Sequence, residues 1–167
     1  MGGPRGARTP FTKLVPEFDA DQNGRLEGQE LQRARVRIRD LRNAPEDSRR
    51  GGPGNRRGVA SPTPGPAISP DAVRIHGDES LFDPYVLRTY FLEFENEDWE
   101  RELEDFYRTD VDIPATLRVD GNVYPGVGVR FRGNSSYFSL SEGQKRGLNL
   151  SINHSQSDLR LLGIRTV

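Results

Sequence analysis

The sequence contains no cysteine, so neither a disulfide framework nor a thiolate metal site can form. It contains no apolar run long enough to span a membrane. Its first ten residues, MGGPRGARTP, lack the apolar stretch of a signal peptide. These absences leave the cellular compartment open, because an exported bacterial protein can also lack cysteine.

Apolar residues are scarce as well. They make up 33% of the 167 residues, whereas 18 residues are glycine and 12 are proline. A chain of this composition does not bury a large core along its whole length. We therefore expect one ordinary domain, or a small domain and part of another.

The charges nearly cancel, at 24 basic and 25 acidic residues, but they are unevenly distributed. Nine arginines lie between residues 33 and 57, and acids cluster in EFENEDWERELED at residues 93–105. The basic stretch suggests a nucleic-acid partner, and RRGGPGNRRG is similar to Arg/Gly-rich RNA-binding tracts. Because it is one short block without repeats or interleaved aromatic residues, a solvated linker is favoured and a nucleic-acid partner is not expected.

This linker is expected at residues 43–71. The stretch holds six prolines, several glycines and almost no apolar side chains. Burial cannot offset the entropy cost of ordering such a segment, so we predict a disordered Pro/Gly/Arg linker. It separates a first region, 10–42, from a second, 72–167.

The most specific pattern lies in the twelve residues from Asp19 to Glu30, DADQNGRLEGQE. Gly24 is sixth, where a calcium loop turns sharply, and Leu26 is eighth, where an apolar residue points into a small core. A hard cation that takes roughly 6–8 oxygens needs this density of ligands on a short loop. The candidate ligands occupy positions one, three, five, seven, nine and twelve, the seventh through its backbone carbonyl: Asp19, Asp21, Asn23, Arg25, Glu27 and Glu30.

The flanks of the loop have the spacing of amphipathic helices. Loop and flanks together resemble the helix–loop–helix of an EF-hand, which implies Ca²⁺ as a ligand. The alternative is an acidic turn that binds nothing. The apolar positions are Phe11, Leu14, Val15 and Phe18 before the loop and Leu31, Ala34, Ile38 and Leu41 after it.

The sequence has no second loop of this pattern. EF-hands usually occur in pairs, so a single one must dock on the rest of the protein, pair with another molecule, or bind calcium weakly. A structural or extracellular role for calcium is favoured over that of a sensor, because the sequence shows neither the groove nor the target that a sensor needs.

The second region has the pattern of an α+β fold. A strand is predicted at 85–94 and a helix at 96–107. A hairpin is predicted from strands 113–119 and 123–132 around the turn-forming residues 120–122. A further strand begins at 148–152, and 161–167 reads as the start of one more. His76 and His154 are too isolated in the sequence to indicate another active site.

The segments VGVRFRGNSSY and KRGLNLSIN in this region resemble the CotH kinase family, which comprises spore-coat-type proteins with a divergent protein-kinase-like fold. The preceding segments RTYFLEFENEDWERELEDFY and VDIPATLRVDGNVYPGVGVRFRG also look like the amino-terminal part of that family. The resemblance covers 83–167, and Gly147 departs from the serine more common there. It implies an incomplete β-rich lobe of a kinase-like fold. An EF-hand ahead of such a region resembles the layout of exported bacterial members, so export or a cell-surface location is expected for the full-length protein.

The resemblance also implies residues for nucleotide contact. A kinase surrounds the nucleotide phosphates with cations and backbone amides. Lys145 is the candidate phosphate-contacting lysine, with Arg132 beside it and Ser135 and Ser136 in the intervening loop. An acid paired with that lysine is expected on the 96–107 helix, without a choice among its carboxylates. The alternative is an exposed basic strand face followed by an ordinary polar turn.

The family's catalytic acid and metal-binding aspartates belong to a segment that would follow residue 167, so we expect a fragment with no catalytic residue of its own. ATP and Mg²⁺ are then cofactors of the full-length protein alone, with a protein substrate as a candidate partner. Three functions stay open: a calcium-binding front portion of a CotH-type kinase, a non-enzymatic coat or surface protein rigidified by calcium, and, least favoured, an RNA-associated protein.

Overall fold

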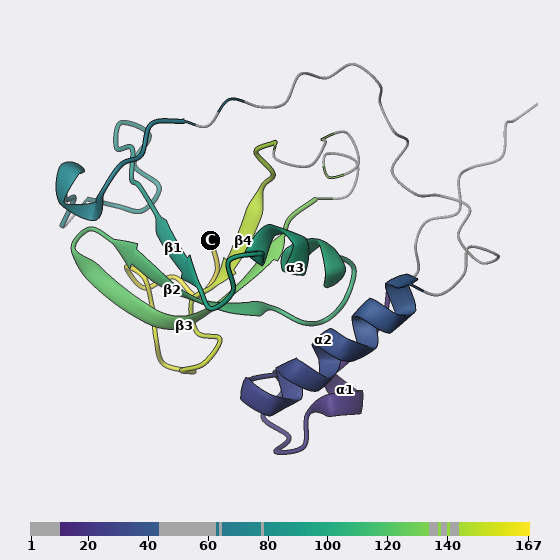
Figure 1. Ribbon diagram of the computed structural model, residues 1–167. Coiled ribbons are helices and arrows are strands. Elements are labelled where there is room, and N and C mark those ends of the chain that lie inside the picture. The colour runs from purple at the N-terminus through teal and green to yellow at the C-terminus, as the bar shows by residue number, and fades with distance from the viewer. Residues whose placement is uncertain are drawn as a thin grey trace, which may run out of the picture. The chain divides into compact units, whose positions relative to one another are not determined.

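The computed structural model describes residues 11–43, 63, 65–77, 79–133, 137, 140 and 144–167. Most of the predicted linker 43–71 and the candidates Ser135 and Ser136 lie outside these residues. The described elements mix helices with one four-stranded sheet, so the α+β class is confirmed (Figure 1). In the described part of the chain, no helix is both long and apolar enough to cross a membrane.

The chain forms two compact units that alternate along the sequence. The first unit comprises Met1–Pro62, Glu104–Val111 and Phe131–Gly147. The second comprises Thr63–Leu103, Asp112–Arg130 and Leu148–Val167. Two stretches of the region 72–167 thus lie in the first unit.

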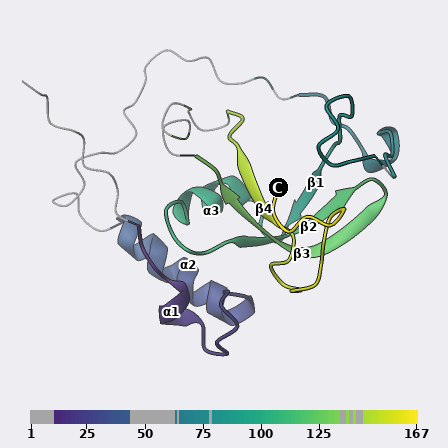
Figure 2. The same ribbon diagram turned by 180° about the vertical axis from the view of Figure 1, so that it is seen from behind.

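The first unit contains two helices joined by the acidic loop. Helix α1 is Val15–Phe18 and helix α2 is Gly28–Asn43, and the two lie side by side (Figures 1 and 2). The apolar spacing identifies much of the buried face, because Leu14, Leu31, Ala34 and Ile38 are all at most 4% exposed. Phe11 departs from the predicted helical face: it precedes α1 and is 55% exposed.

The second unit is built on the sheet, whose strands follow in the order β1-β2-β3-β4. Strand β2, Ile113–Val119, pairs antiparallel with β3, Asn122–Phe131, and confirms the predicted hairpin. Asp120 and Gly121 form its turn at φ +49° and +74°. Two positive φ angles are those of a type I′ turn, whose twist suits a two-residue hairpin. Every second residue of β2 is buried, as expected for a strand with one face on a core.

Strand β1 is shorter than predicted, at Phe91–Phe94 instead of 85–94, and pairs antiparallel with β2. The β-forming residues before it lie in a loop instead, with Tyr85 95% and Leu87 88% exposed. Arg88 holds this loop through hydrogen bonds to the carbonyl oxygens of Glu79 (2.6 Å) and Ser80 (2.8 Å). These tertiary contacts override the local strand preference.

Helix α3, Trp99–Asp105, and strand β4, Leu148–Ser151, lie close to their predicted positions at 96–107 and 148–152. The segment 161–167, predicted as the start of a strand, instead forms isolated bridges, Leu161 with Ile164 and Thr166 with Ser151. A short 3₁₀ helix, η2, is Pro70–Ala72. The end of the chain lies beside β4 in both views, where Leu150 and Val167 exchange backbone hydrogen bonds of 2.8 and 2.9 Å (Figures 1 and 2).

Candidate metal centre and other functional residues

The acidic loop links the end of α1 to the start of α2. Asp19 is the C-cap residue of α1, and its N–H donates to the carbonyl oxygen of Val15. Glu30 lies in the first turn of α2. Leu26 between them is 1% exposed, so an apolar side chain anchors the loop to the interior of the unit. Asp19 and Glu30 thus attach the loop to the two helices, and Leu26 attaches its middle to the interior of the unit.

Three carboxylates of the loop converge. Asp19, Asp21 and Glu30 each contribute a carboxylate oxygen to a cluster in which these atoms lie within 4.8 Å of one another. Like charges at this separation repel, so a bound cation would stabilise the arrangement strongly. Carboxylate oxygens are also the ligands that hard divalent cations prefer.

Backbone amides orient these carboxylates. The oxygens of Asp19 accept hydrogen bonds from the N–H groups of Asn23 (3.1 Å) and Gly24 (2.8 Å). Asp21 accepts from the same Asn23 N–H at 3.1 Å, and Glu30 accepts from the N–H of Ala20 at 2.8 Å. Each oxygen that receives an amide hydrogen is held in direction while its other lone pairs stay available. The Glu30 contact closes the loop, since it joins the first turn of α2 to the residue after Asp19.

A left-handed backbone makes the tight loop possible. Gly24 has φ +82°, a conformation that a residue with a Cβ adopts only at a cost. The neighbouring Arg25 N–H donates to Oδ1 of Asn23, the fifth residue of the loop, at 3.0 Å, so the chain turns back over this side chain. The glycine at the sixth position therefore has the conformation that the loop pattern requires of it.

The predicted ligands fall into two groups. Asp19, Asp21 and Glu30 are brought together, whereas Glu27 forms an ion pair with Arg25, with Nε and Oε1 3.2 Å apart. Position nine of such a loop often acts through a water molecule, so the side chain need not enter the cluster. Arg25 was expected to contribute its carbonyl only, and its side chain pairs with Glu27.

Two of the predicted nucleotide-contacting residues, Arg132 and Lys145, lie in the described part of the chain. Arg132 and Lys145 are both exposed. The side chain of the neighbouring Arg146, in contrast, is buried: it is 6% exposed and pairs with Glu104 of α3. Its guanidinium also lies over the rings of Phe131 (5.2 Å) and Tyr137 (4.8 Å).

Sequence reasoning missed the roles of Arg146 and Glu104. The expectation of an acid on the 96–107 helix did not single out Glu104 among the carboxylates there. The pairing joins positions 42 residues apart. The only local signal was the basic pair itself, which cannot show which of two adjacent cations is buried.

A second polar cluster lies in the second unit around Asp112. Its carboxylate accepts a hydrogen bond from Ser151 Oγ at 2.8 Å and lies 3.2 Å from Arg130 Nε. His154 Nδ1 is 4.0 Å from the same carboxylate. The Ser151 hydroxyl donates to the aspartate, whereas the serine of a catalytic triad donates to the histidine.

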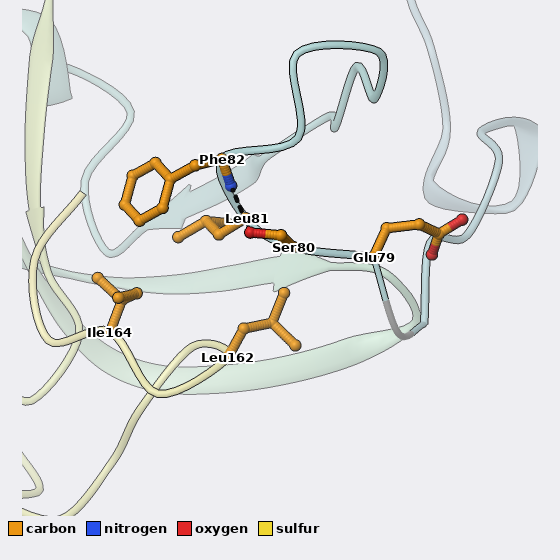
Figure 3. Close-up of a pocket in the computed structure, with 6 residues that line it drawn as sticks. All are labelled: Glu79, Ser80, Leu81, Phe82, Leu162 and Ile164. Carbon is orange, nitrogen blue, oxygen red and sulfur yellow. Dashed lines mark hydrogen bonds between the residues drawn. The ribbon is translucent and has the colours of Figure 1, made fainter.

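A cavity of about 380 Å³ also lies in the second unit, between the 79–82 loop and the end of the chain (Figure 3). Leu81, Phe82, Leu162 and Ile164 supply its apolar lining. Figure 3 shows the Glu79 carboxylate pointing away from these four side chains. The pKa of Glu79 is lowered by a backbone hydrogen bond and then by His76, so this carboxyl group is not tuned to act as an acid near neutral pH.

Compared with models of protein families, with curated proteins and with solved structures, the chain matches none. The function of the chain is therefore inferred from its residues and their geometry.

Proposed function

We propose that the chain binds Ca²⁺ through the loop from Asp19 to Glu30, which acts as an EF-hand. The convergence of the Asp19, Asp21 and Glu30 carboxylates within 4.8 Å carries this proposal. Asn23 Oδ1, the carbonyl oxygen of Arg25 and a water held by Glu27 complete the ligand set. Calcium suits this set better than magnesium, because Mg²⁺ usually keeps several waters and is rarely held by a cage made entirely of protein.

Isothermal titration of the chain with CaCl₂ tests the proposal. Glu30→Gln and Asp19→Ala should each weaken binding at least about tenfold, a loss of about 1.4 kcal/mol. Arg25→Ala should bind as the unaltered chain does, because a backbone carbonyl survives the substitution. Glu17→Gln is the matched control for Glu30→Gln, since Glu17 is an exposed acid of α1 outside the loop. Equal affinity in all of these variants would remove the assignment.

We further propose that the region 72–167 is the amino-terminal portion of a CotH-type atypical protein kinase domain. In complete form the kinase would transfer phosphate from ATP to a protein, with Mg²⁺ as its metal. The exposed positions of Arg132 and Lys145 suit cations that meet an incoming nucleotide. Ser135 and Ser136, which lie outside the described residues, are further candidates for this contact. Lys145→Ala in a protein that includes the catalytic segment should abolish ATP binding.

The second candidate is a calcium-stabilised coat or surface protein without enzymatic activity. The exposed apolar side chains of the 79–87 loop favour it, with Phe82 73%, Tyr85 95% and Leu87 88% exposed. Large apolar side chains exposed together are typical of interaction surfaces. ATP binding that depends on Lys145 would decide for the kinase, and its absence from the complete protein would decide for the coat protein.

A further inference from the structure

The segment Glu104–Val111 contacts the beginning of the helix–loop–helix. Asp110 Oδ1 accepts hydrogen bonds from the N–H groups of Leu14 (2.7 Å) and Val15 (3.2 Å). These N–H groups stand at the start of α1, where helical amides lack partners within the helix and a carboxylate is stabilising. The N–H of Thr12 also donates to the carbonyl oxygen of Arg108 at 3.0 Å, beside a parallel β-bridge from Thr12 to Thr109.

The same segment contacts the far end of α2. Nη2 of Arg42, in the last turn of α2, donates to the carbonyl oxygens of Glu104 (3.3 Å), Asp105 (3.0 Å) and Tyr107 (3.1 Å). These carbonyls lie at the end of α3, where helical carbonyls need outside donors. The two hydrogens of this one nitrogen are therefore shared among three acceptors, and hydrogen bonds from a charged donor are stronger than neutral ones.

The segment is also ordered from within. Thr109 is 4% exposed, and its Oγ1 donates to the carbonyl oxygen of Phe106 at 2.8 Å and accepts from the N–H of Val111 at 3.2 Å. Phe106 and Val111 are 4% and 2% exposed. The segment thus runs from the last residues of α3 into a partly buried irregular stretch, and the two helices contact it at their outer ends.

Calcium ligands occupy the inner ends of those helices. Asp19 caps the end of α1, and Glu30 lies in the first turn of α2. A cation held by both would fix the two helices relative to each other at the loop. The contacts of Asp110 with the start of α1 and of Arg42 at the end of α2 also require that the two helices keep fixed positions relative to each other.

We infer that Glu104–Val111 is the intramolecular partner on which the single helix–loop–helix docks, and that calcium affinity and the order of this segment are coupled. The inference rests on the proposed calcium binding. Coupling of this kind is reciprocal: whatever calcium contributes to docking, docking contributes to calcium affinity. Because Glu104 also pairs with Arg146, the coupling extends to the Phe131–Gly147 part of the unit.

The experiment measures calcium affinity by isothermal titration in variants that leave the loop untouched. Arg42→Ala and Asp110→Asn should each weaken calcium binding about fivefold or more. The controls are Arg33→Ala and Asp40→Asn, which make the same charge changes at exposed positions of α2 and should bind as the unaltered chain does. Far-UV circular dichroism checks that each variant retains its helices.

A second measurement needs no variant. Calcium should slow hydrogen exchange in the unaltered chain at the amides of Thr109 and Val111 about tenfold. Peptides from β2 in the second unit serve as the internal reference and should not change. Sedimentation with and without calcium should give a monomer in both cases.

The outcomes separate the two proposals. If the chain binds calcium but Arg42→Ala and Asp110→Asn match their controls and the segment gains no protection, the coupling is wrong and the calcium site stands. Dimerisation on calcium addition without protection of 104–111 also overturns it in favour of a second copy as the partner. If the unaltered chain takes up no calcium, both proposals fail together.

Discussion

Arg88 and Asp120 form a buried ion pair in the second unit, with Nε and Oδ2 2.6 Å apart and side chains 3% and 8% exposed. Asp120 is the first residue of the β2–β3 turn, and its other oxygen accepts the N–H of His76 at 2.9 Å. Arg88 also bonds the carbonyl oxygens of Glu79 and Ser80. One ion pair thus joins the hairpin turn to the loop that exposes Phe82.

Removing one partner of this pair should be costly. Arg88→Met leaves the Asp120 carboxylate buried without its cation, and losing one partner of a buried pair costs about 3–5 kcal/mol. Urea denaturation followed by fluorescence of Trp99, the only tryptophan and a residue of the second unit, measures the loss.

Arg118→Met is the matched control for Arg88→Met. Arg118 pairs with Glu93 at 2.8 Å, but the two side chains are 43% and 56% exposed. Solvent screens an exposed pair and weakens its contribution, so this variant should lose little stability. Equal losses in the two variants would show that burial does not set the strength of the Arg88 pair.

Gly128 should resist enlargement. A Cβ at this position of β3 would lie 2.8 Å from Asp112 Cβ and 2.8 Å from the His154 ring, closer than van der Waals contact allows. Overpacking of this kind costs typically about 1–3 kcal/mol, so Gly128→Ala should lower the free energy of unfolding of the second unit by that amount. Gly77→Ala is the control, because a Cβ there meets nothing within 4 Å. A Gly128→Ala variant as stable as Gly77→Ala would contradict the close approach of His154 and Asp112.

The phenol of Tyr137 should ionise at a higher pH than an ordinary tyrosine. Burial, aided by the Glu104 carboxylate, raises the pKa of its phenol from 10.0 to about 12, and the Arg146 cation opposes the shift only in part. The native state therefore holds its proton more tightly than the unfolded state does. Stability from this group is fully present below about pH 10 and is lost as the pH rises from about 10 to 12.

Spectrophotometric titration of the five tyrosines measures this directly. The component that ionises near pH 12 should disappear in Tyr137→Phe. It should persist in Tyr85→Phe, because Tyr85 is 95% exposed. Persistence of the late component in Tyr137→Phe would assign it to another tyrosine.

The elements that could be predicted from sequence are those specified by neighbouring residues. The β2–β3 hairpin follows from alternating apolar residues around Asp120 and Gly121, two residue types that tolerate positive φ. The spacing of the acids within one short loop likewise anticipates that Asp19, Asp21 and Glu30 lie together. The calcium ion itself and the kinase-like fold stay predictions.

The tertiary structure alone decided the contacts between distant residues. The segment 85–90 has the composition of a strand, yet Arg88 holds it in a loop through acceptors whose positions depend on the fold. Arg42 reaches the carbonyl oxygen of Glu104 across 62 residues of sequence, and Asp110 reaches Leu14 across 96. Side-chain spacing describes only a helix's own faces, so it cannot show which segment those faces will meet. The acidic loop could therefore be predicted from the sequence. The contacts that hold its two helices depend on the tertiary structure, because they join residues far apart in the chain.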